Sequence, residues 1–409
     1  MRLVVVTPHF APDVAPTGAV VTRIVEELAL RAHRIEVITA LPWYRDHRVE
    51  RDFTGKLVRH EDTPWGRITR INPFPAGDKR DIVRRAAAFG GFSVLAGLLG
   101  ARGTAADGVL AVSPPLTLGP AGWAAARSRR APFVFNVQDV FPDVAIELGV
   151  LQHPLVIALA RRLERASYER ADAVTVLSED LRDNVADKVS RPAKVRVIPN
   201  FVDTRRITPV ERDNAYRREH GLEGRFVVMY AGNVGLSQSL DLLLTSAAVL
   251  RDETDVTFVI NGQGAGRADL ERRARGLLNV RFVDMQPAER LPELLAAADV
   301  HVVPLKRGLA RSSVPSKTLS ILAAGRPLVA SVDRGSEVAL LCERSHAGIA
   351  VPPDDPEAFT KALRRLIEGP EEARRMGAAG RAFVETWASP AAVALAYESL
   401  FEELRGSSG

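Results

Sequence analysis

Residues 315–317, Pro-Ser-Lys, place a lysine at what reads as the first turn of a helix. The start of a helix carries unpaired N–H groups and about half a positive charge, so it attracts anions and repels cations. Lys317 fits this position if a phosphate lies in front of the helix and is bound by the lysine and by the N–H groups of the helix start. A solvated surface lysine is the alternative interpretation, which this short stretch does not exclude.

The loop before this helix strengthens the phosphate interpretation. Residues 305–317 contain four cations and three hydroxyl side chains, which are Lys306, Arg307, Arg311 and Lys317 with Ser312, Ser313 and Ser316. Cationic groups combined with hydroxyls at a helix entry suit a diphosphate. The sequence therefore predicts a diphosphate-binding loop here, and a solvated basic loop is the alternative.

Two glycine-rich turns occur earlier in the same half of the chain. The turn YAGNVG (230–235) contains Gly232 and Gly235 between a strand and a helix, where a loop can fold around a phosphate. The run NGQGAG (261–266), which includes Gly262, follows the next strand. A dinucleotide fingerprint belongs in the first strand-to-helix turn, with an acid about 20 residues later. We therefore interpret this second run as a turn that leaves room for a ligand, not as an NAD site.

The first candidate loop in the N-terminal half is TPHFAPDVAPTGA (7–19), which ends with Thr17 and Gly18 at a helix start. Gly18 would let a ligand approach the backbone closely. His9 is the one histidine in a predicted ligand loop. An ordinary surface loop stiffened by proline, with a structural histidine, is the alternative interpretation.

The second candidate loop is NVQDVFPDVA (136–145), which ends a buried strand with Gln138, Asp139 and Asp143. Polar groups in such positions commonly line a ligand pocket. The alternative is that the aspartates cap the following helix, an interpretation that fits Asp143 better than Asp139.

Short Val/Ile-rich runs alternate with helical stretches almost from end to end. The predicted strands are 3–6, 35–39, 108–112, 132–137 and 173–177, followed by 225–232, 256–262, 279–284, 299–305 and 326–331. Continuous apolar strands separated by helices indicate parallel sheets covered on both faces. Residues 354–369 predict a helix with Asp355 as its cap and Gly369 at its exit.

The pattern restarts near residue 206, so we predict an α/β fold of two doubly wound, Rossmann-like domains that face a central cleft. The first spans 1–205 and the second 206–387, and helix 388–405 is expected to return to the first domain. In such sheets ligands bind beyond the carboxyl ends of the strands, which is where all the candidate loops lie.

Composition limits the classes of function. The chain of 409 residues is 46% hydrophobic and 26% charged, with a net charge of +5. This mild excess is compatible with phosphate-bearing substrates or an anionic membrane surface, but it is too small to indicate nucleic acid. The single cysteine, Cys342, excludes an intramolecular disulfide and indicates a reducing compartment. The N-terminus reads as a strand and the uncharged stretch 86–101 is too short to span a membrane, so a cytoplasmic protein is expected.

Seven segments, in order, carry a family resemblance. They are PHFAPD with Thr17-Gly18, NVQDVFPD, VLSEDL, VIPNFVD, YAGNVG, LPELLAAADVHVVPLK and VPSKTLSILAAGRP. Over nearly its whole length the chain resembles glycosyltransferase family 4, the retaining, metal-independent nucleotide-sugar transferases with the GT-B fold. Within that family it is most similar to bacterial fucosaminyltransferase-like enzymes that build polysaccharide repeat units on lipid carriers.

The resemblance implies roles for the candidate residues. The second domain would bind a nucleotide-diphosphate sugar, expected to be UDP-linked, and the first domain the acceptor, a glycan or a polyprenyl-diphosphate-linked saccharide. Lys317, with backbone amides at 232–235 and 315–317, would meet the charge of the diphosphate, and Asp139 and Gln138 would position substrate. The donor set is Gly232, Asn233, Gly235, Gly262, Arg311, Ser312, Ser316, Lys317 and Ser320, and the acceptor set is His9, Thr17, Gly18 and Asp143. No metal, other cofactor or nucleic acid is expected.

Four positions depart from the family pattern. Ser312 and Ser320 stand where the commonest signature has two glutamates, the second of which holds the ribose. Asn233 stands where many relatives have an arginine, and Gln138 stands where a histidine often touches the donor sugar. A hydrogen bond can survive the last change, but a titrating group cannot.

Further alternatives remain open. The apolar stretch 86–101 is flanked by Lys79, Arg80, Arg84, Arg85 and Arg102. It could dock at the cytoplasmic leaflet or form a buried helix. A nucleotide-sugar 2-epimerase of the same fold and a silent nucleotide-sugar binding protein are the rival functions.

Overall fold

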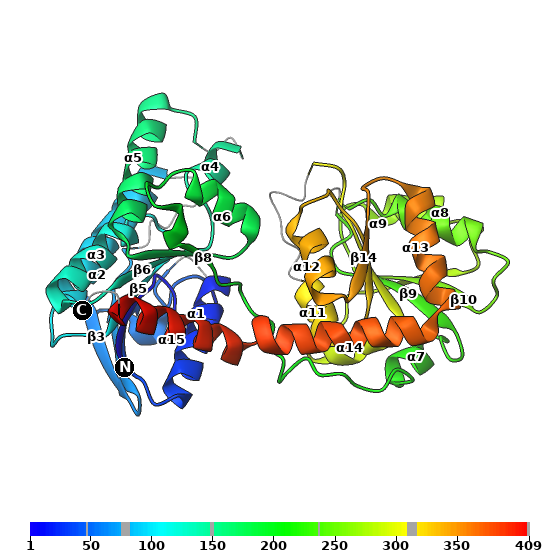
Figure 1. Ribbon diagram of the computed structural model, residues 1–409, viewed down its shortest axis with the longest axis horizontal. Coiled ribbons are helices and arrows are strands. Elements are labelled where there is room, and N and C mark those ends of the chain that lie inside the picture. Colours follow the sequence, from blue (N-terminus) through cyan, green and yellow to red (C-terminus); the bar gives the residue numbers. More distant parts are fainter. Residues whose placement is uncertain (46–47, 75–81, 148–150, 236–237, 309–316, 407–409) are drawn as a thin grey trace. The chain divides into compact units, whose positions relative to one another are not determined.

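The computed structural model describes residues 1–45, 48–74, 82–147, 151–235, 238–308 and 317–406, with the side chains of 82–87 and 147 left aside. They form two compact units, Met1–Asn200 with Pro390–Gly409, and Phe201–Ser389 (Figure 1). The division after Asn200 lies five residues before the position expected from the sequence. Each unit is built around its own sheet with helices on both faces.

The described strands of the first unit form one sheet in the order β3-β4-β2-β1-β5-β6-β7-β8. All neighbouring pairs are parallel except the β3-β4 hairpin at the edge. The strands are β1 (Arg2–Val6), β2 (Arg34–Ala40), β3 (Val58–Thr63), β4 (Gly66–Ile71), β5 (Gly108–Ser113), β6 (Phe133–Val137), β7 (Ala173–Val176) and β8 (Val195–Val197). The polar hairpin strands lack the long apolar runs of the others, and the sequence pattern did not reveal them.

Helices cover both faces of this sheet. They are α1 (Pro16–Leu30), α2 (Ile82–Gly100), α3 (Leu118–Arg129), α4 (Asp143–Glu147), α5 (Pro154–Arg170), α6 (Glu179–Ala186) and α15 (Pro390–Gly406). Helix α3 packs against α2 and α5, and α15 packs against α1. Along β6, Phe135 faces the core with Tyr168 of α5, whereas Asn136 bonds to Tyr397 of α15. Because successive side chains of a strand point to opposite faces, α5 and α15 cover opposite faces of the sheet.

The second unit has a parallel sheet in the order β11-β10-β9-β12-β13-β14 among its described residues. Its strands are β9 (Phe226–Ala231), β10 (Val256–Asn261), β11 (Val280–Val283), β12 (Val300–Pro304), β13 (Leu328–Ser331) and β14 (Gly348–Val351). Its helices are α7 (Ala215–Glu219), α8 (Asp241–Val249), α9 (Arg267–Arg273), α10 (Leu291–Ala296), α11 (Lys317–Ala323), α12 (Glu337–Ser345), α13 (Pro356–Glu368) and α14 (Pro370–Trp387). Val227 and Met229 of β9 join the core on one face of the sheet, and Val228 and Tyr230 join the core on the other.

Both sheets reverse their strand order at one point. In the first unit the chain fills the positions β2 and β4 on one side of β1 and then continues from β5 on the other side. In the second unit β10 and β11 lie on one side of β9, and β12 to β14 lie on the other. The carboxyl ends of the two strands at such a switch point frame a ligand crevice. The expected doubly wound α/β fold is confirmed, and it locates one such crevice in each unit.

The helix predicted over residues 354–369 is confirmed, with the predicted cap and exit residues. Helix α13 starts at Pro356, with the Asp355 Oδ1 accepting a hydrogen bond of 2.9 Å from the Ala358 N–H, and it ends at Gly369. None of the helices in the described ranges is long and apolar enough to cross a membrane.

Candidate functional site

Lys317 lies at the switch point of the second sheet. It is the first residue of α11, and its Nζ lies 4.0 Å from the ring centroid of Tyr230, near the end of β9. The same Nζ donates to the Oε1 of Gln238 over 3.5 Å. A cation above the face of an aromatic ring is attracted by the quadrupole of the ring. The ring and the amide therefore hold the ammonium group at the carboxyl end of β9, next to Gly232.

Among the described residues, Lys317 has no counter-ion. No carboxylate in the part of the chain that the structure describes forms an ion pair with it, and burial lowers the pKa of Lys317 to about 7. Desolvation disfavours the charged form of an amine, and a nearby anion favours it. An anion bound beside Nζ would thus restore the charge that burial weakens.

The two glycine turns are joined to each other. The Gly232 N–H donates to the Asn261 carbonyl over 2.9 Å, and the Val234 N–H donates to the Gln263 carbonyl over 2.8 Å. Gly262 has a φ of 153°, and a Cβ added to it would lie 1.8 Å from the Gly232 carbonyl oxygen. Only glycine tolerates both that backbone and that approach. The room beside Gly262 is therefore filled by the neighbouring turn, and Gly262 supports the site by letting the turns join.

This bonding limits which amides of the 232–235 turn can bind a ligand. The N–H groups of Gly232, Val234 and Gly235 all donate to protein carbonyls. Among the described residues, the N–H of Asn233 is the one in this turn with no such acceptor. Asn233 is also exposed, so its amide is the available backbone donor beside Lys317.

Acidic side chains from later strands hold the loop after β12. Asp354, which follows β14, accepts hydrogen bonds from the Ser239 Oγ over 2.6 Å and from the Arg307 N–H over 3.2 Å. Asp333, which follows β13, accepts one from the Gly308 N–H over 2.8 Å. These aspartates, like Tyr230 and Gln238, were missed by sequence reasoning. Their spacing along the chain carries no signal, because each contact joins the ends of separate strands.

In the first unit, His9 forms a dyad with Asp13. The His9 Nδ1 lies 2.7 Å from the Oδ2 of Asp13, which is buried and also accepts a 3.1 Å hydrogen bond from the Tyr44 N–H at Oδ1. The ring of His9 stacks on Trp43 at 5.6 Å between centroids. Since an ionised carboxylate only accepts, the His9 Nδ1–H donates to Asp13.

Gly18 is explained by the same arrangement. A Cβ at Gly18 would lie 2.9 Å from the Cβ of His9, so this position keeps space for the histidine. Thr17 lies half-buried in the first turn of α1. The structure thus brings His9, Thr17 and Gly18 together at the carboxyl end of β1, as the sequence grouped them.

Gln138 belongs to a chain of hydrogen bonds that begins at α15. The Asn136 Nδ2 donates to the Tyr397 hydroxyl over 3.0 Å, the Gln138 Nε2 donates to the Asn136 Oδ1 over 2.6 Å, and the Asn200 Nδ2 donates to the Gln138 Oε1 over 2.9 Å. Both ends of the Gln138 amide are therefore held. Sequence reasoning missed the other three members: Asn136 lies two residues from Gln138, but Asn200 and Tyr397 are far from it in the chain.

The two aspartates after β6 differ. Asp139 is exposed, and the atoms packed around its carboxyl raise its pKa by desolvation. Asp143 opens α4 and accepts a 2.6 Å ion pair from the Lys188 Nζ, which also binds Glu164 at 2.7 Å. Asp143 thus ties α4 to α5 and α6, whereas Asp139 keeps its carboxyl exposed at the carboxyl end of β6.

The remaining predicted donor residues divide into two groups. Ser320 is half-buried in α11, one turn after Lys317. Arg311, Ser312 and Ser316 lie outside the described residues. No set of three or more His, Cys, Asp or Glu side chains within the described ranges is arranged to hold a metal ion.

Two sequence families match the chain. "Glycosyl transferase 4-like domain" matches residues 17–200, and "Glycosyl transferases group 1" matches residues 225–369. WcaI of Escherichia coli, named as a glycosyl transferase of colanic acid biosynthesis, is 30% identical over 90% of this chain and 92% of its own. WbjE of Pseudomonas aeruginosa, named as a glycosyltransferase, is 28% identical over 58% of this chain and 60% of its own.

Solved structures show the same fold at lower identity. Sucrose-phosphate synthase of Thermosynechococcus elongatus has a TM-score of 0.66 and 19% identity, with both chains covered completely. Anabaena HepE in complex with UDP has a TM-score of 0.64 and 15% identity over 98% of this chain and all of its own.

Proposed function

Because the chain belongs to the glycosyl transferases, with a 4-like first domain and a group 1 second domain, we propose that it moves a sugar from a nucleoside diphosphate to a hydroxyl of a glycan or lipid-linked saccharide. The observation that supports this most is Lys317, a half-buried lysine at the switch point of the second sheet, whose pKa is lowered by desolvation and which has no counter-ion in the described residues. A helix start, a half-buried cation and an exposed amide at Asn233 together suit a diphosphate.

In the proposed reaction the bond from the anomeric carbon to the diphosphate breaks, and the acceptor oxygen bonds to that carbon on the same face, with retention. Lys317 and the Asn233 N–H neutralise the charge that develops on the leaving diphosphate, which lowers the barrier. The proton of the acceptor hydroxyl passes to a phosphate oxygen of the leaving group. No metal or other cofactor takes part, and transfer at an unchanged rate in excess EDTA tests that.

The first unit orients the reacting groups in this proposal. His9 offers its Nε2 in a direction set by Asp13, and Asp139 offers an exposed carboxyl. Gln138 is held by Asn136 and Asn200, so it acts as a positioning residue. Held side chains keep substrate hydroxyls in a reactive geometry at little entropic cost.

We propose UDP as the nucleotide. Anabaena HepE, of the same fold, has been solved with UDP and with UDP-glucose, whereas a mycobacterial relative 31% identical over 55% of this chain is named for GDP-mannose. Calorimetric titration with UDP, GDP, ADP and dTDP tests the choice. We expect one nucleotide to bind, with binding lost in Lys317→Ala and kept in Lys361→Ala, which removes an exposed lysine of α13. Absence of binding by all four would contradict the transferase proposal.

The His9–Asp13 dyad favours one alternative, a nucleotide-sugar 2-epimerase. Such an isomerase needs acid and base side chains at the sugar, and the dyad with Asp139 could serve. Incubation with the nucleotide sugar that binds, without acceptor, distinguishes the two. An epimerised nucleotide sugar would support the isomerase, and its absence together with transfer to a lipid-linked acceptor would support the transferase.

For the acceptor we propose a saccharide of cell-envelope polysaccharide synthesis, carried on a lipid at the cytoplasmic face of the membrane. The stretch 86–101 lies largely in α2, which buries Phe92 and Ala96 and leaves Val94 and Leu98 exposed. Helix α5, on the same face of the sheet, exposes Leu155 and Leu159 beside several arginines. Apolar side chains among cations suit an anionic lipid surface.

Co-sedimentation with vesicles containing phosphatidylglycerol tests this contact. We expect binding at low salt that falls when Leu155 and Leu159 are both changed to serine. Leu278→Ser is the matched control, because Leu278 is 96% exposed in the second unit. Equal binding by both variants, or none by the unmodified protein, would remove the membrane proposal.

A further inference from the structure

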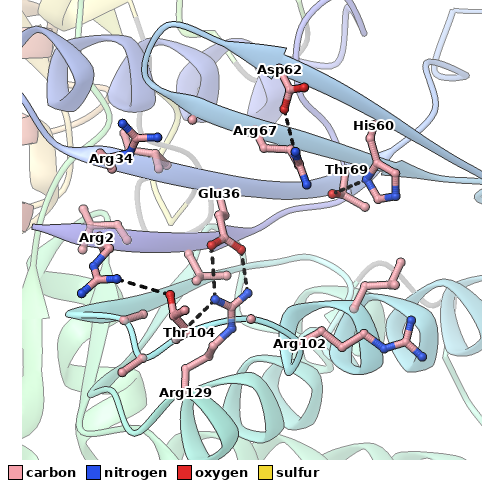
Figure 2. Close-up of a pocket in the computed structure, with 18 residues that line it drawn as sticks. Arg2, Arg34, Glu36, His60, Asp62, Arg67, Thr69, Arg102, Thr104 and Arg129 are labelled. Carbon is pink, nitrogen blue, oxygen red and sulfur yellow. Dashed lines mark hydrogen bonds and ion pairs between the residues drawn. The ribbon is translucent and has the colours of Figure 1, made fainter.

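A pocket lies at the amino-terminal ends of the strands of the first sheet, opposite the carboxyl ends that carry His9 and Gln138. It has a volume of about 530 Å³ and lies between the starting residues of β1, β2 and β4 and the end of α2 with the loop that follows it. Figure 2 shows the side chains that line it, which include Arg2, Arg34, Arg67, Arg102 and Arg129 with Glu36, Asp62, His60, Thr69 and Thr104. We call it the amino-edge pocket. None of the family-derived roles falls on these residues.

The strand register places two arginines side by side. Arg2 of β1 and Arg34 of β2 are partners in the parallel pair, and Glu36 is the partner of Arg67. Residues two apart on a strand share a face, so Arg2, Arg34, Glu36 and Arg67 all lie on the face that lines the pocket. Directly neighbouring like charges on adjacent strands destabilise a sheet. An anion between Arg2 and Arg34 would remove that repulsion.

The acids of the pocket are already bound to other cations. Glu36 forms a bidentate ion pair with the buried Arg129 at 2.6 and 3.2 Å, and Asp62 binds the Arg67 Nε at 2.8 Å. Nearby Asp107 accepts from the Arg2 backbone N–H at 2.7 Å and from Arg405 at 3.1 Å. Figure 2 shows Glu36 turned toward Arg129 and away from Arg34.

Three guanidinium groups are left without a carboxylate among the described residues. They belong to Arg2, Arg34 and Arg102, and all three residues are exposed. Within the described residues, the Arg2 guanidinium donates to the Thr104 hydroxyl over 3.3 Å and to no other side chain. Arg2 and Arg34 lie at one end of the pocket in Figure 2, with Arg102 at the other. Arginine presents a planar fork of donors that matches phosphate oxygens.

We propose that the amino-edge pocket binds a small phosphorylated sugar, with its phosphate between Arg2 and Arg34. A volume of about 530 Å³ lies within the range of ordinary small-molecule sites, roughly 300–1,000 Å³. The described residues of the lining include no Phe, Tyr or Trp ring on which a nucleobase could stack. It does contain the Thr104 hydroxyl and the His60–Thr69 pair, in which Nδ1 and Oγ1 lie 3.1 Å apart, and such groups suit sugar hydroxyls. The site is distinct from the donor site proposed around Lys317.

The test is calorimetric titration of the full chain with glucose 6-phosphate at low salt, with glucose and inorganic phosphate as comparison probes. We expect glucose 6-phosphate to bind most tightly, phosphate more weakly and glucose not at all. Arg34→Gln should weaken glucose 6-phosphate binding about tenfold, because a hydrogen-bonded ionic contact is lost. Because Arg34 is exposed at the start of β2, we expect Arg34→Gln to fold normally. An unchanged melting temperature verifies this.

Two control variants separate this site from others. Arg161→Gln removes an exposed arginine of α5 and the same charge, and it should bind glucose 6-phosphate as the unmodified protein does. Lys317→Ala should also bind it normally. Equal loss in Arg161→Gln, loss in Lys317→Ala, or unchanged binding in both Arg34→Gln and Arg2→Gln would overturn the proposal. Phosphate binding as tight as that of glucose 6-phosphate would overturn the assignment of a sugar.

Discussion

The polar side chains at the carboxyl edges of the two sheets differ in how many of them have internal partners. At the first edge His9 bonds to Asp13, Gln138 to Asn136 and Asn200, and Asp143 to Lys188, and Asp139 is the one predicted acid that keeps an exposed carboxyl in the described residues. At the second edge the turns are bonded to each other, but Lys317 rests on a tyrosine ring with no carboxylate partner in the described residues.

This difference indicates two roles, orientation of a substrate at the first edge and binding of an anion at the second. Side chains that are held by internal hydrogen bonds can orient a substrate, and they also contribute to the stability of the fold. A buried cation without a counter-ion costs stability, and the cost is recovered only when an anion binds. Variants of the first edge should therefore affect folding, and variants of Lys317 should affect ligand binding and catalysis.

The largest effect is expected for Lys317→Ala in sugar transfer. Loss of one group that stabilises developing charge lowers kcat/KM by about 10²–10³-fold. Initial rates with the nucleotide sugar that binds measure it, with Lys361→Ala as the control that should keep its activity. A decrease in kcat/KM smaller than about threefold would mean that another group stabilises the charge on the leaving diphosphate. Lys317 would then not distinguish the second edge from the first.

Gly262→Ala tests how far the second edge depends on its joined turns. The new Cβ would meet the Gly232 carbonyl oxygen, so we expect the free energy of unfolding to fall by roughly 3 kcal/mol or more. Gly221→Ala is the matched control, because Gly221 also has a positive φ of 60° but no atom within 4 Å of an added Cβ. Its cost should stay near 1 kcal/mol. Equal costs in urea unfolding would show that the turns can separate.

Opposite signs of stability change are expected for Gln138→Ala and Lys317→Met. The first removes the donor to the Asn136 Oδ1 and the acceptor of the Asn200 Nδ2, and it should lower the free energy of unfolding by about 1–3 kcal/mol. The second removes a partly desolvated charge and should raise the free energy of unfolding by about 1 kcal/mol near pH 6, where Lys317 is protonated. Denaturant unfolding of both variants measures the changes, and a loss of stability in Lys317→Met would mean that the ring contact outweighs desolvation.

The pH dependence of that difference has a defined sign. Lys317 has a pKa of about 7 in the folded state and an ordinary value of 10.5, so between these values the unfolded chain binds more protons. The free energy of unfolding therefore rises as the pH increases from 7 to 10.5. The destabilising effect of the Lys317 charge is complete below about pH 7. The advantage of Lys317→Met should shrink as pH increases from 7 to 10.5.

The smallest effect is a proton taken up with the nucleotide. A diphosphate beside Nζ raises the pKa of Lys317 again, so binding at pH 8 should take up roughly one proton per nucleotide. Calorimetry in buffers of different ionisation enthalpy measures this uptake, which should vanish in Lys317→Ala. Uptake that persists in the variant would assign the proton to another group.

The fold was predictable from local patterns. Apolar runs such as 256–262 became β10, and Asp355 with Gly369 delimited α13 as their types indicate. Strand and helix signals are local because they depend on side chains two to four positions apart. The β3–β4 hairpin escaped this reasoning because its strands are polar and lie at the edge.

The candidate site was predictable only in part. Sequence reasoning placed His9 and Lys317 at strand ends, but it did not pair His9 with Asp13 or Lys317 with Tyr230. It assigned Asp143 to the acceptor, where the structure uses its carboxylate to bind Lys188. Charge and residue type do not reveal whether a group already has a partner.

By itself the sequence determined two doubly wound α/β domains, their family, and the loops at the carboxyl ends of the strands. The tertiary structure decided which polar groups in those loops are satisfied internally and which are left for a ligand. The physical reason is that strand order brings together residues as distant as Tyr230 and Lys317, or Asn136 and Tyr397. The hydrogen-bond partners and the desolvation of a side chain at these contacts, not its residue type, determine whether its charge is available to a ligand.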